Sequence, residues 1–163
     1  MIDFDTIRLE EISLDTLADV KAVSGKLLAV DFGDVRTGLA VSDPSRLLAS
    51  GIGYVSPGGI EKTAEAIAQA AADQGAVAVV VGLPVNMDGS EGSRASRCRK
   101  LACYVKVLCG LKVAMFDERM TTMTASRYLN ETNTRGKKRK TVIDTLSAQI
   151  ILQNCLDRLK YMN

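Results

Sequence analysis

Apolar residues along this chain form short runs that predict strands and helical stripes that predict helices. The first three runs lie at 26–31, 37–43 and 49–55, with short turns between them. Runs spaced this closely predict a meander of three antiparallel strands. Residues 76–82 are apolar apart from Gly82, which predicts a central strand covered on both faces. A further apolar run at 112–117 predicts the last strand.

Helical periodicity fills the stretches between and after the later strands. The first helix follows Pro57 and ends at Gly75, a typical C-terminal residue. Three more helices are expected, at 93–108, from Thr121 or Thr122 to about 129, and at about 141–159. The resulting order, βββαβαβαα, predicts an α/β fold in which a mixed five-stranded sheet carries helices on its faces.

Residues 1–25 look like an N-terminal extension that precedes a single domain at 26–163. The alternating apolar residues between Phe4 and Leu9 predict a short strand. Ser13 is a good N-cap for a short helix that follows it. We therefore expect two domain-level parts, the extension and one α/β domain. The acidic character of the extension makes it a poor phosphate binder, so we expect it to serve stability or assembly.

Composition narrows the possible chemistry. The chain has 163 residues, four cysteines and no histidine. Because the chain has no histidine, a Cys/His zinc site and a histidine-assisted nucleophile are both excluded, and the four cysteines form no CxxC pair. We interpret the cysteines as reduced thiols. Any catalysis must then depend on carboxylates, Lys or Arg, hydroxyls, thiols or a bound metal.

The charge is distributed unevenly between the two parts of the chain. Residues 1–89 contain 6 Lys or Arg and 13 Asp or Glu, whereas residues 90–163 contain 15 and 6. A basic half indicates an anionic partner, unless the two sets intermix on the folded surface. The apolar runs are too short to span a bilayer. Because the N-terminus is acidic and lacks the order of a signal peptide, we expect a cytoplasmic protein with no membrane partner.

Three acidic residues lie where predicted elements begin or end. Asp31 ends the first strand, Glu118 follows the last strand, and Asp144 lies in the first turn of the last helix. On that helix Asp144 heads a stripe expected to face the sheet, whose further members are Ala148, Ile151 and Cys155. This placement directs three carboxylates toward the strand ends.

Carboxylates that meet at one place repel one another unless a cation lies between them. Oxygen ligands without imidazole suit Mg²⁺ or Mn²⁺. Such ions can activate water and stabilise the leaving oxygen of a phosphodiester. Asp31, Glu118 and Asp144 are therefore candidate catalytic and metal-binding residues, and we expect their carboxylates to lie within roughly 4–8 Å of one another, a span that allows direct or water-bridged metal contacts.

Each acid also has a structural interpretation. Asp31 fits a turn residue or an ion-pair partner of Arg36. Glu118 fits a partner of Arg119 or a cap for the following helix. Asp144 fits a capping box, and an acid at that position also suits the helix dipole. The residues alone leave both interpretations open.

Four motifs resemble those of the YqgF family, also called RuvX-type Holliday junction resolvases. The motifs lie at 31–43, 81–89, 117–122 and 143–148. Each motif is weak alone, but together they follow the order and spacing of the family over roughly residues 26–158. Residues 1–25 fall outside the pattern.

The resemblance implies a ribonuclease H-like fold and metal-dependent phosphodiester cleavage, with Asp31, Glu118 and Asp144 at the matching acidic positions. It also implies a role in 5′-end maturation of the small-subunit (16S) ribosomal RNA precursor, or, by an older assignment, Holliday junction resolution. Other ribonuclease H-like enzymes have an acid after the central strand. Here Gly82 takes that place, so Glu118 from the next strand must serve instead.

Several polar residues near these motifs are candidate substrate contacts. Arg36 and Arg119 could bind a scissile phosphate or neutralise the neighbouring acids. Asn86 and Asp88 could contact substrate or a metal-bound water, or could serve ordinary turn chemistry. The basic run Lys137, Lys138, Arg139 and Lys140 is expected in a loop directly before the last helix. A loop there could follow a phosphate backbone, or it could be solvated and idle.

Two other classes of function compete with a nuclease. A nucleotide-binding fold of the actin and sugar-kinase type also has an acidic motif in its first hairpin, but such proteins duplicate the domain. A non-catalytic module that binds nucleic acid is the second rival. The substrate, ribosomal RNA precursor or branched DNA, stays open, as do endo- or exonucleolytic action and the oligomeric state.

Overall fold

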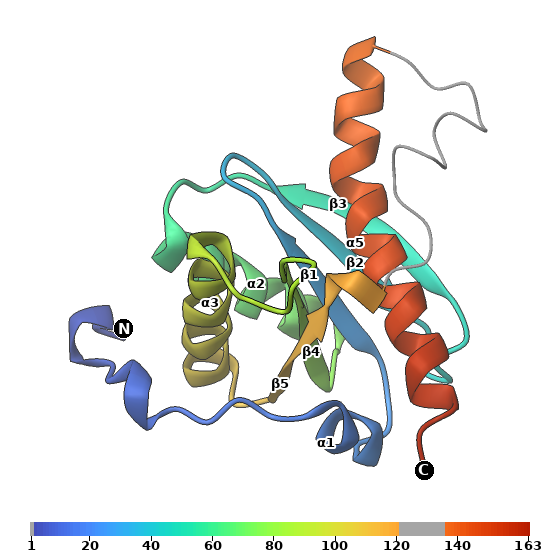
Figure 1. Cartoon of the computed structure of the whole chain (residues 1–163), viewed down its shortest axis with the longest axis horizontal. Helices are drawn as coiled ribbons and strands as arrows, with labels where there is room; N and C mark the ends of the chain where they lie inside the picture. Colours follow the sequence, from blue (N-terminus) through green and yellow to red (C-terminus); the bar gives the residue numbers. More distant parts are fainter. Residues whose placement is uncertain (1, 121–135) are drawn as a thin grey trace.

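A mixed five-stranded sheet separates two helical layers in the computed structural model (Figure 1). The structure describes residues 2–120 and 136–163, and residues 136–145 are described by their backbone alone. The strands are β1 (Leu27–Phe32), β2 (Thr37–Ser42), β3 (Ala49–Val55), β4 (Ala78–Leu83) and β5 (Lys112–Asp117). The α-helices are α1 (Leu17–Ala22), α2 (Ile60–Gln74), α3 (Ser93–Cys109) and α5 (Gly136–Lys160).

The strand order is β3-β2-β1-β4-β5, which confirms the predicted mixed sheet. Strands β1, β2 and β3 form the expected antiparallel meander, whereas β4 pairs parallel with both β1 and β5. The β1–β2 turn requires a glycine, because a Cβ at Gly33 would lie 2.3 Å from the carbonyl oxygen of Arg36. All six residues of β4 are buried, as its continuous apolar run predicts.

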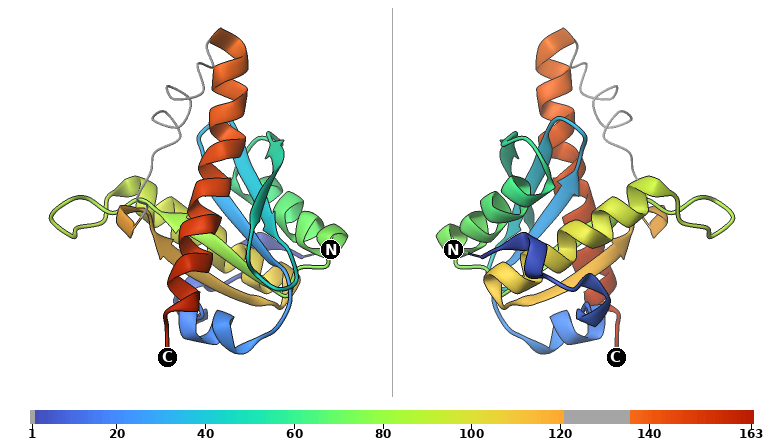
Figure 2. Two further views of the ribbon diagram at one scale, coloured as in Figure 1. Left: turned by 90° about the vertical axis from the view of Figure 1, so that its right-hand side faces the viewer. Right: turned by 90° about the vertical axis from the view of Figure 1, so that its left-hand side faces the viewer.

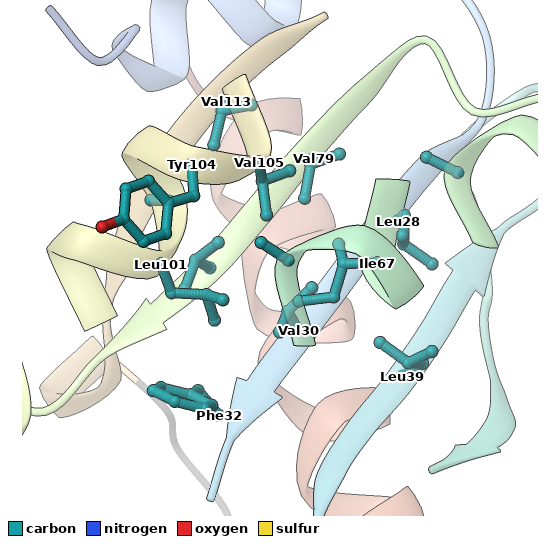
Figure 3. Packing of buried hydrophobic residues seen from close by; sticks show 14 of the residues in the cluster. Leu28, Val30, Phe32, Leu39, Ile67, Val79, Leu101, Tyr104, Val105 and Val113 are labelled. Atoms are coloured by element: carbon teal, nitrogen blue, oxygen red, sulfur yellow. The ribbon is translucent and has the colours of Figure 1, made fainter. Parts of the chain in front are cut away.

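Two apolar cores lie on the two faces of the sheet. On one face, α2 and α3 pack on alternate residues of the strands, including Leu28, Val30 and Val79 (Figure 3). On the other face, α5 packs on the intervening residues, such as Ala29 and Val80. In β1, β4 and β5 alternation therefore assigns successive residues to opposite faces, whereas a β-bulge between the partners of Leu39 and Ala40 interrupts it in β3.

Helix α5 crosses the sheet, and its first turns extend beyond the strands (Figures 1 and 2). Its buried residues include Ala148, Ile151 and Cys155, which confirms the predicted stripe. The helix begins at Gly136, so the expected loop for the run 137–140 is wrong. The physical reason is that Lys and Arg are good helix formers, so the helical backbone continues through them.

The N-terminal segment differs from its prediction. In place of a strand there are two 3₁₀ helices, Phe4–Thr6 and Leu9–Glu11. Asp3 stabilises the first of them, because its side chain accepts a hydrogen bond from the Asp5 N–H. The expected Ser13 cap is also wrong. Helix α1 begins at Leu17, and Thr16 and Asp19 form its capping box.

The extension packs on the domain. The Phe4 and Tyr104 rings pack in a T-shaped arrangement with 4.9 Å between their centroids, and Asp15 forms an isolated parallel bridge with Ala114 of β5. An edge strand leaves backbone donors and acceptors unpaired, so this bridge protects part of the β5 edge. The apolar residues of the extension supply packing for the core under α3.

The other predicted elements agree with the structure to within two residues, apart from one outside its described part. The short helix expected from Thr121 or Thr122 to about 129 falls on residues that the structure does not describe. A 3₁₀ helix, Glu118–Met120, directly follows β5. Among the described residues, no helix has both the length and the apolar character needed to cross a membrane.

Candidate active site

Two of the candidate acids lie at the same edge of the sheet. Asp31 is near the carboxyl end of β1, and Glu118 follows the carboxyl end of β5. Strand β4 lies between them and is parallel to both, with Val81 opposite Val30. The carboxyl ends of parallel strands meet at one edge, so both acids are placed there.

Both acids also belong to the face covered by α5. Leu27 and Ala29 of β1 are members of the α5-side core, so alternation places Asp31 on that face. Phe116 of β5 belongs to the same core. Two residues farther along the chain, Glu118 reaches the α5 face beside β4.

The absence of a side chain at Gly82 leaves space for the Glu118 side chain. A Cβ at Gly82 would lie 3.4 Å from both Cγ and Cδ of Glu118, and 2.9 Å from Cδ1 of Ile151. The Glu118 side chain therefore lies over the backbone of β4 and beside α5. Gly82 occupies the position that carries an acid in other ribonuclease H-like enzymes. The Glu118 side chain packs over this same position.

Electrostatics mark Glu118 as unusual. Burial, followed by the negative charges of Asp31 and Asp117, raises the pKa of Glu118 to about 7, although the positive charge of Arg94 opposes the shift. Within the described part of the chain Glu118 forms no ion pair. A carboxylate in this setting binds a proton or a cation more readily than an exposed one does.

The thiol of Cys98 lies near the same acids and is not a nucleophile. Burial raises its pKa to about 11, and the charges of Glu118 and Asp31 contribute while Arg94 and Arg97 oppose them. A thiol with such a pKa is protonated at neutral pH. All four cysteines are free, which agrees with their interpretation as reduced thiols, and all but the partly buried Cys109 are buried.

Asp144 belongs to α5, but its side chain lies outside the described residues. The later members of the predicted stripe face the sheet, since Ala148, Ile151 and Cys155 are buried. The clustering of Asp144 with Asp31 and Glu118 stays a prediction. Among the side chains that the structure describes, no three His, Cys, Asp or Glu residues are grouped so that they could hold a metal ion.

Arg119 does not pair with the candidate acid Glu118. Its guanidinium donates to both carboxylate oxygens of Asp117, with Nη2 at 2.8 Å from Oδ2 and Nε at 3.2 Å from Oδ1. Nη1 also donates to the carbonyl oxygen of Asn86 at 3.4 Å. The bonds from Arg119 to Asp117 lower the pKa of Asp117. The bond to Asn86 connects the end of β5 to the loop after β4. The position favours a role in holding that loop.

Asn86 and Asp88 lie in a tight turn of the same loop. The Asn86 side chain donates to Ser90 Oγ at 3.0 Å, and Asp88 Oδ1 accepts from the Ser90 N–H at 2.9 Å. The Gly89 N–H closes the turn on the Asn86 carbonyl at 2.8 Å. Both side chains therefore perform turn chemistry, and their contact with substrate stays a prediction.

The remaining candidates lie on the β1–β2 turn and on α5. The guanidinium of Arg36 lies 5.4 Å from the centre of the Tyr54 ring, a cation–π contact. Lys137 to Lys140 lie in the part of α5 that extends beyond the sheet, and their side chains lie outside the described residues. Contact of these cations with phosphate is untested.

Two residues near the acids were not among the sequence candidates. Arg94 is exposed in the first turn of α3, and its charge acts on both Glu118 and Cys98. Gly82 shapes the space around Glu118. The basic composition of the α3 helix was a signal for Arg94, whereas nothing in the spacing shows which of its cations influences Glu118.

Comparison with known proteins connects this geometry to a family. The family model described as "RuvX: Holliday junction resolvase" matches residues 25–158. A protein of Rhodopirellula baltica is 36% identical over 90% of this chain and 84% of its own length. One of Paracoccus denitrificans is 37% identical over 92% of this chain and 95% of its own length. Both carry the name "Putative pre-16S rRNA nuclease".

Among solved structures, Thermus thermophilus RuvC in complex with a Holliday junction substrate has a similar fold. The TM-score is 0.54, the identity is 13%, and the match covers 85% of this chain and 98% of the RuvC chain. At this identity the likeness concerns the fold alone. It confirms the predicted ribonuclease H-like α/β architecture.

Proposed function

The chain belongs to the RuvX family, and from this premise we propose that it is a hydrolase that cleaves phosphodiester bonds in nucleic acid with divalent metal ions. The observation that carries the proposal is the placement of Asp31 and Glu118 on one face and one edge of the sheet. The elevated pKa of Glu118 supports a site that is completed by an added cation.

The residues present fit a hard divalent cation. Asp31 and Glu118 supply carboxylate oxygens, and Asp144 on α5 is the proposed third ligand. These donors suit Mg²⁺ or Mn²⁺. When bound, such an ion supplies an activated water and stabilises negative charge on the phosphate.

The chain's own cations would orient the substrate. Arg94 is exposed near Glu118 and is suited to contact a phosphate oxygen. Arg36, Asn86 and Asp88 are proposed contacts on the surrounding turns. Arg119, whose guanidinium is engaged by Asp117, would position the loop after β4 instead of binding phosphate directly.

The names of the curated relatives favour a precursor of 16S ribosomal RNA as the substrate, and we propose 5′-end maturation of that RNA as the role. The description of the matching family model favours a second candidate, a Holliday junction. Both substrates present phosphates to the same acids, so the chemistry at Asp31 and Glu118 would be shared.

A cleavage panel tests the proposal. The protein, Asp31→Asn and the control Asp34→Asn would be incubated with Mn²⁺ and either precursor RNA, single-stranded RNA, duplex DNA or a four-way DNA junction. Asp34 is an exposed acid of the adjacent turn that pairs with Arg97 at 3.0 Å. We expect the wild type and Asp34→Asn to cleave the precursor, and Asp31→Asn to be inactive while equally folded.

The outcomes separate the candidates. Cleavage confined to the junction would favour the resolvase. Binding without cleavage by the wild type would favour a non-catalytic module, and tight ATP binding without cleavage would favour the kinase-like fold. Full activity in Asp31→Asn would show that the proposed site is wrong.

The basic first turns of α5 are a proposed phosphate contact. Replacing Lys137, Lys138, Arg139 and Lys140 with Ser should weaken binding about equally for all sequences, since phosphate contacts carry no base information. Each lost contact should reduce the slope of log affinity against log salt by about 0.7–0.9. Lys62→Ser, on exposed α2 surface, is the control. An unchanged slope in the fourfold variant would exclude this contact.

A further inference from the structure

Strand β4 lies between the strands that carry Asp31 and precede Glu118, and it has a glycine, Gly82, beside Glu118. Gly82 is opposite Phe116 in the β4–β5 ladder, and both belong to the side of the sheet covered by α5. The residue before it in the β1–β4 ladder, Val81, is opposite Val30, which precedes Asp31. Gly82 therefore lies between the strand positions that bring Asp31 and Glu118 to the site.

Glu118 and Ile151 occupy the space that a side chain at position 82 would need. The Cβ position of residue 82 is 3.4 Å from two carbons of Glu118 and 2.9 Å from Ile151 Cδ1. Side chains longer than alanine would extend from that Cβ into the volume held by the Glu118 side chain. The backbone of Gly82 lies within a regular strand and has no positive φ, so conformational freedom does not explain the glycine.

We propose that Gly82 is a positioning residue for the Glu118 carboxylate, and that the site accepts one carboxylate from β4 or from β5 but not from both. The role of that carboxylate as a metal ligand rests on the proposed function. The geometric part of the proposal rests only on the packing of Gly82, Glu118 and Ile151.

A graded series at position 82 follows from these distances. Gly82→Ala brings a methyl group into ordinary contact with Glu118 and displaces only the flexible end of Ile151, so its effect should be small. Gly82→Val adds two further methyl groups and should move the Glu118 carboxylate. We expect Gly82→Val to weaken Mn²⁺ binding about tenfold, the low end of the range for residues that orient a metal ligand.

A substitution at Ile151 distinguishes displacement of the Glu118 carboxylate from overcrowding against α5. In Gly82→Val/Ile151→Ala the crowding against α5 is relieved, so stability in EDTA should return toward that of Ile151→Ala alone. Mn²⁺ binding should stay weak, since the contact with Glu118 remains. If Ile151→Ala restored both stability and Mn²⁺ binding, the role of Gly82 would be packing against α5 and the proposal would be overturned.

The transposed variant gives the sharpest test. An Asp at position 82 would place its carboxyl group one bond beyond the Cβ, inside the space vacated in Glu118→Gly. We expect Gly82→Asp/Glu118→Gly to bind Mn²⁺ about tenfold more tightly than Glu118→Gly, and to regain detectable cleavage.

The measurements are Mn²⁺ titration by calorimetry on the full chain, urea unfolding in EDTA, and cleavage with kcat and KM determined separately. Gly82→Val should lower kcat more than it raises KM, because phosphate contacts elsewhere are intact. Wild-type Mn²⁺ affinity in Gly82→Val, or a folded transposed variant no better than Glu118→Gly, would overturn the inference. A wild type that neither binds Mn²⁺ nor cleaves nucleic acid would instead contradict the proposed function.

Discussion

A partly buried carboxyl group lies at each end of strand β5, and the two groups differ in whether the protein supplies them with hydrogen-bond donors and positive charge. At the amino end, the Asp15 side chain is 13% exposed and accepts hydrogen bonds from Lys106 Nζ at 2.5 Å and from the Val113 N–H at 2.8 Å. At the carboxyl end, Glu118 lies over Gly82 and, within the described residues, forms no ion pair.

The pKa values reflect this difference. Burial alone would raise the pKa of Asp15, but the hydrogen bonds from Lys106 and Val113 and the positive charges of Lys106 and Lys112 outweigh it, so the pKa is lowered. Burial and the Asp31 charge raise the pKa of Glu118 to about 7. Asp15 is a charge that the fold neutralises internally, whereas Glu118 has no ion-pair partner among the described residues, as expected for the metal ligand proposed above.

The largest expected effect is on cleavage. Glu118→Gln keeps the size of the side chain but removes the charge, and we expect it to lower activity by about a hundredfold or more, since loss of a metal ligand exceeds the effect of an orienting residue. Asp15→Asn should leave the activity of the folded protein within about twofold. Initial rates with Mn²⁺ at equal folded concentrations measure both. Similar losses in the two variants would remove the distinction between the carboxyl groups.

Divalent cation should stabilise the fold through Glu118 and not through Asp15. For the wild type at a Mn²⁺ concentration 100 times the dissociation constant, linkage predicts about 2.7 kcal/mol of added stability. The gain should be largely lost in Glu118→Gln and retained in Asp15→Asn. Urea unfolding with Mn²⁺ or with EDTA measures it, and an equal gain in both variants would contradict a metal site at Glu118.

Removal of the neutralised carboxylate should weaken the fold. Asp15→Ala leaves the Val113 N–H and the half-buried Lys106 without their acceptor, so we expect a loss of about 2 kcal/mol. In EDTA at pH 8, Glu118→Gln should lose no stability. The midpoint of urea unfolding at constant m-value provides the comparison. A stable Asp15→Ala variant would show that the contacts of the extension with β5 contribute little.

The smallest expected effect is on the pH dependence of the free energy of unfolding. The raised pKa of Glu118 means that the folded state holds its proton more tightly than the unfolded state, so this group favours folding below about pH 4.5 and the contribution is lost as pH rises toward 7. One pKa unit corresponds to about 1.4 kcal/mol, and partial exposure reduces the effect.

We therefore expect Glu118→Gln in EDTA to gain about 1–2 kcal/mol relative to the wild type between pH 5 and pH 8. Asp15 has the opposite sign, because its lowered pKa favours folding above the unfolded value, a contribution lost as pH falls through the folded pKa. Its effect should appear only in acid. A constant difference between Glu118→Gln and the wild type across this range would contradict the raised pKa.

Much of the fold could be predicted because the relevant signals are local. Short apolar runs identify the five strands, and helical periodicity identifies α2 and α3. The acids at strand ends follow directly from those boundaries. The start of α5 was harder, because a basic run is compatible with both a solvated loop and a helix that extends into solvent. In the extension, Asp3 caps a 3₁₀ helix where the alternating apolar pattern had predicted a strand, and Thr16 in place of Ser13 caps α1.

By itself, the sequence determined the fold class, the exclusion of histidine chemistry and the candidacy of Asp31 and Glu118, since periodicity and residue type are properties of neighbouring positions. Only the tertiary structure decided that Arg119 binds Asp117, that Asp15 protects the β5 edge, and that Glu118 uses the space above Gly82. These contacts join residues on different strands and helices. Their energies depend on distance and burial, which a linear pattern does not contain.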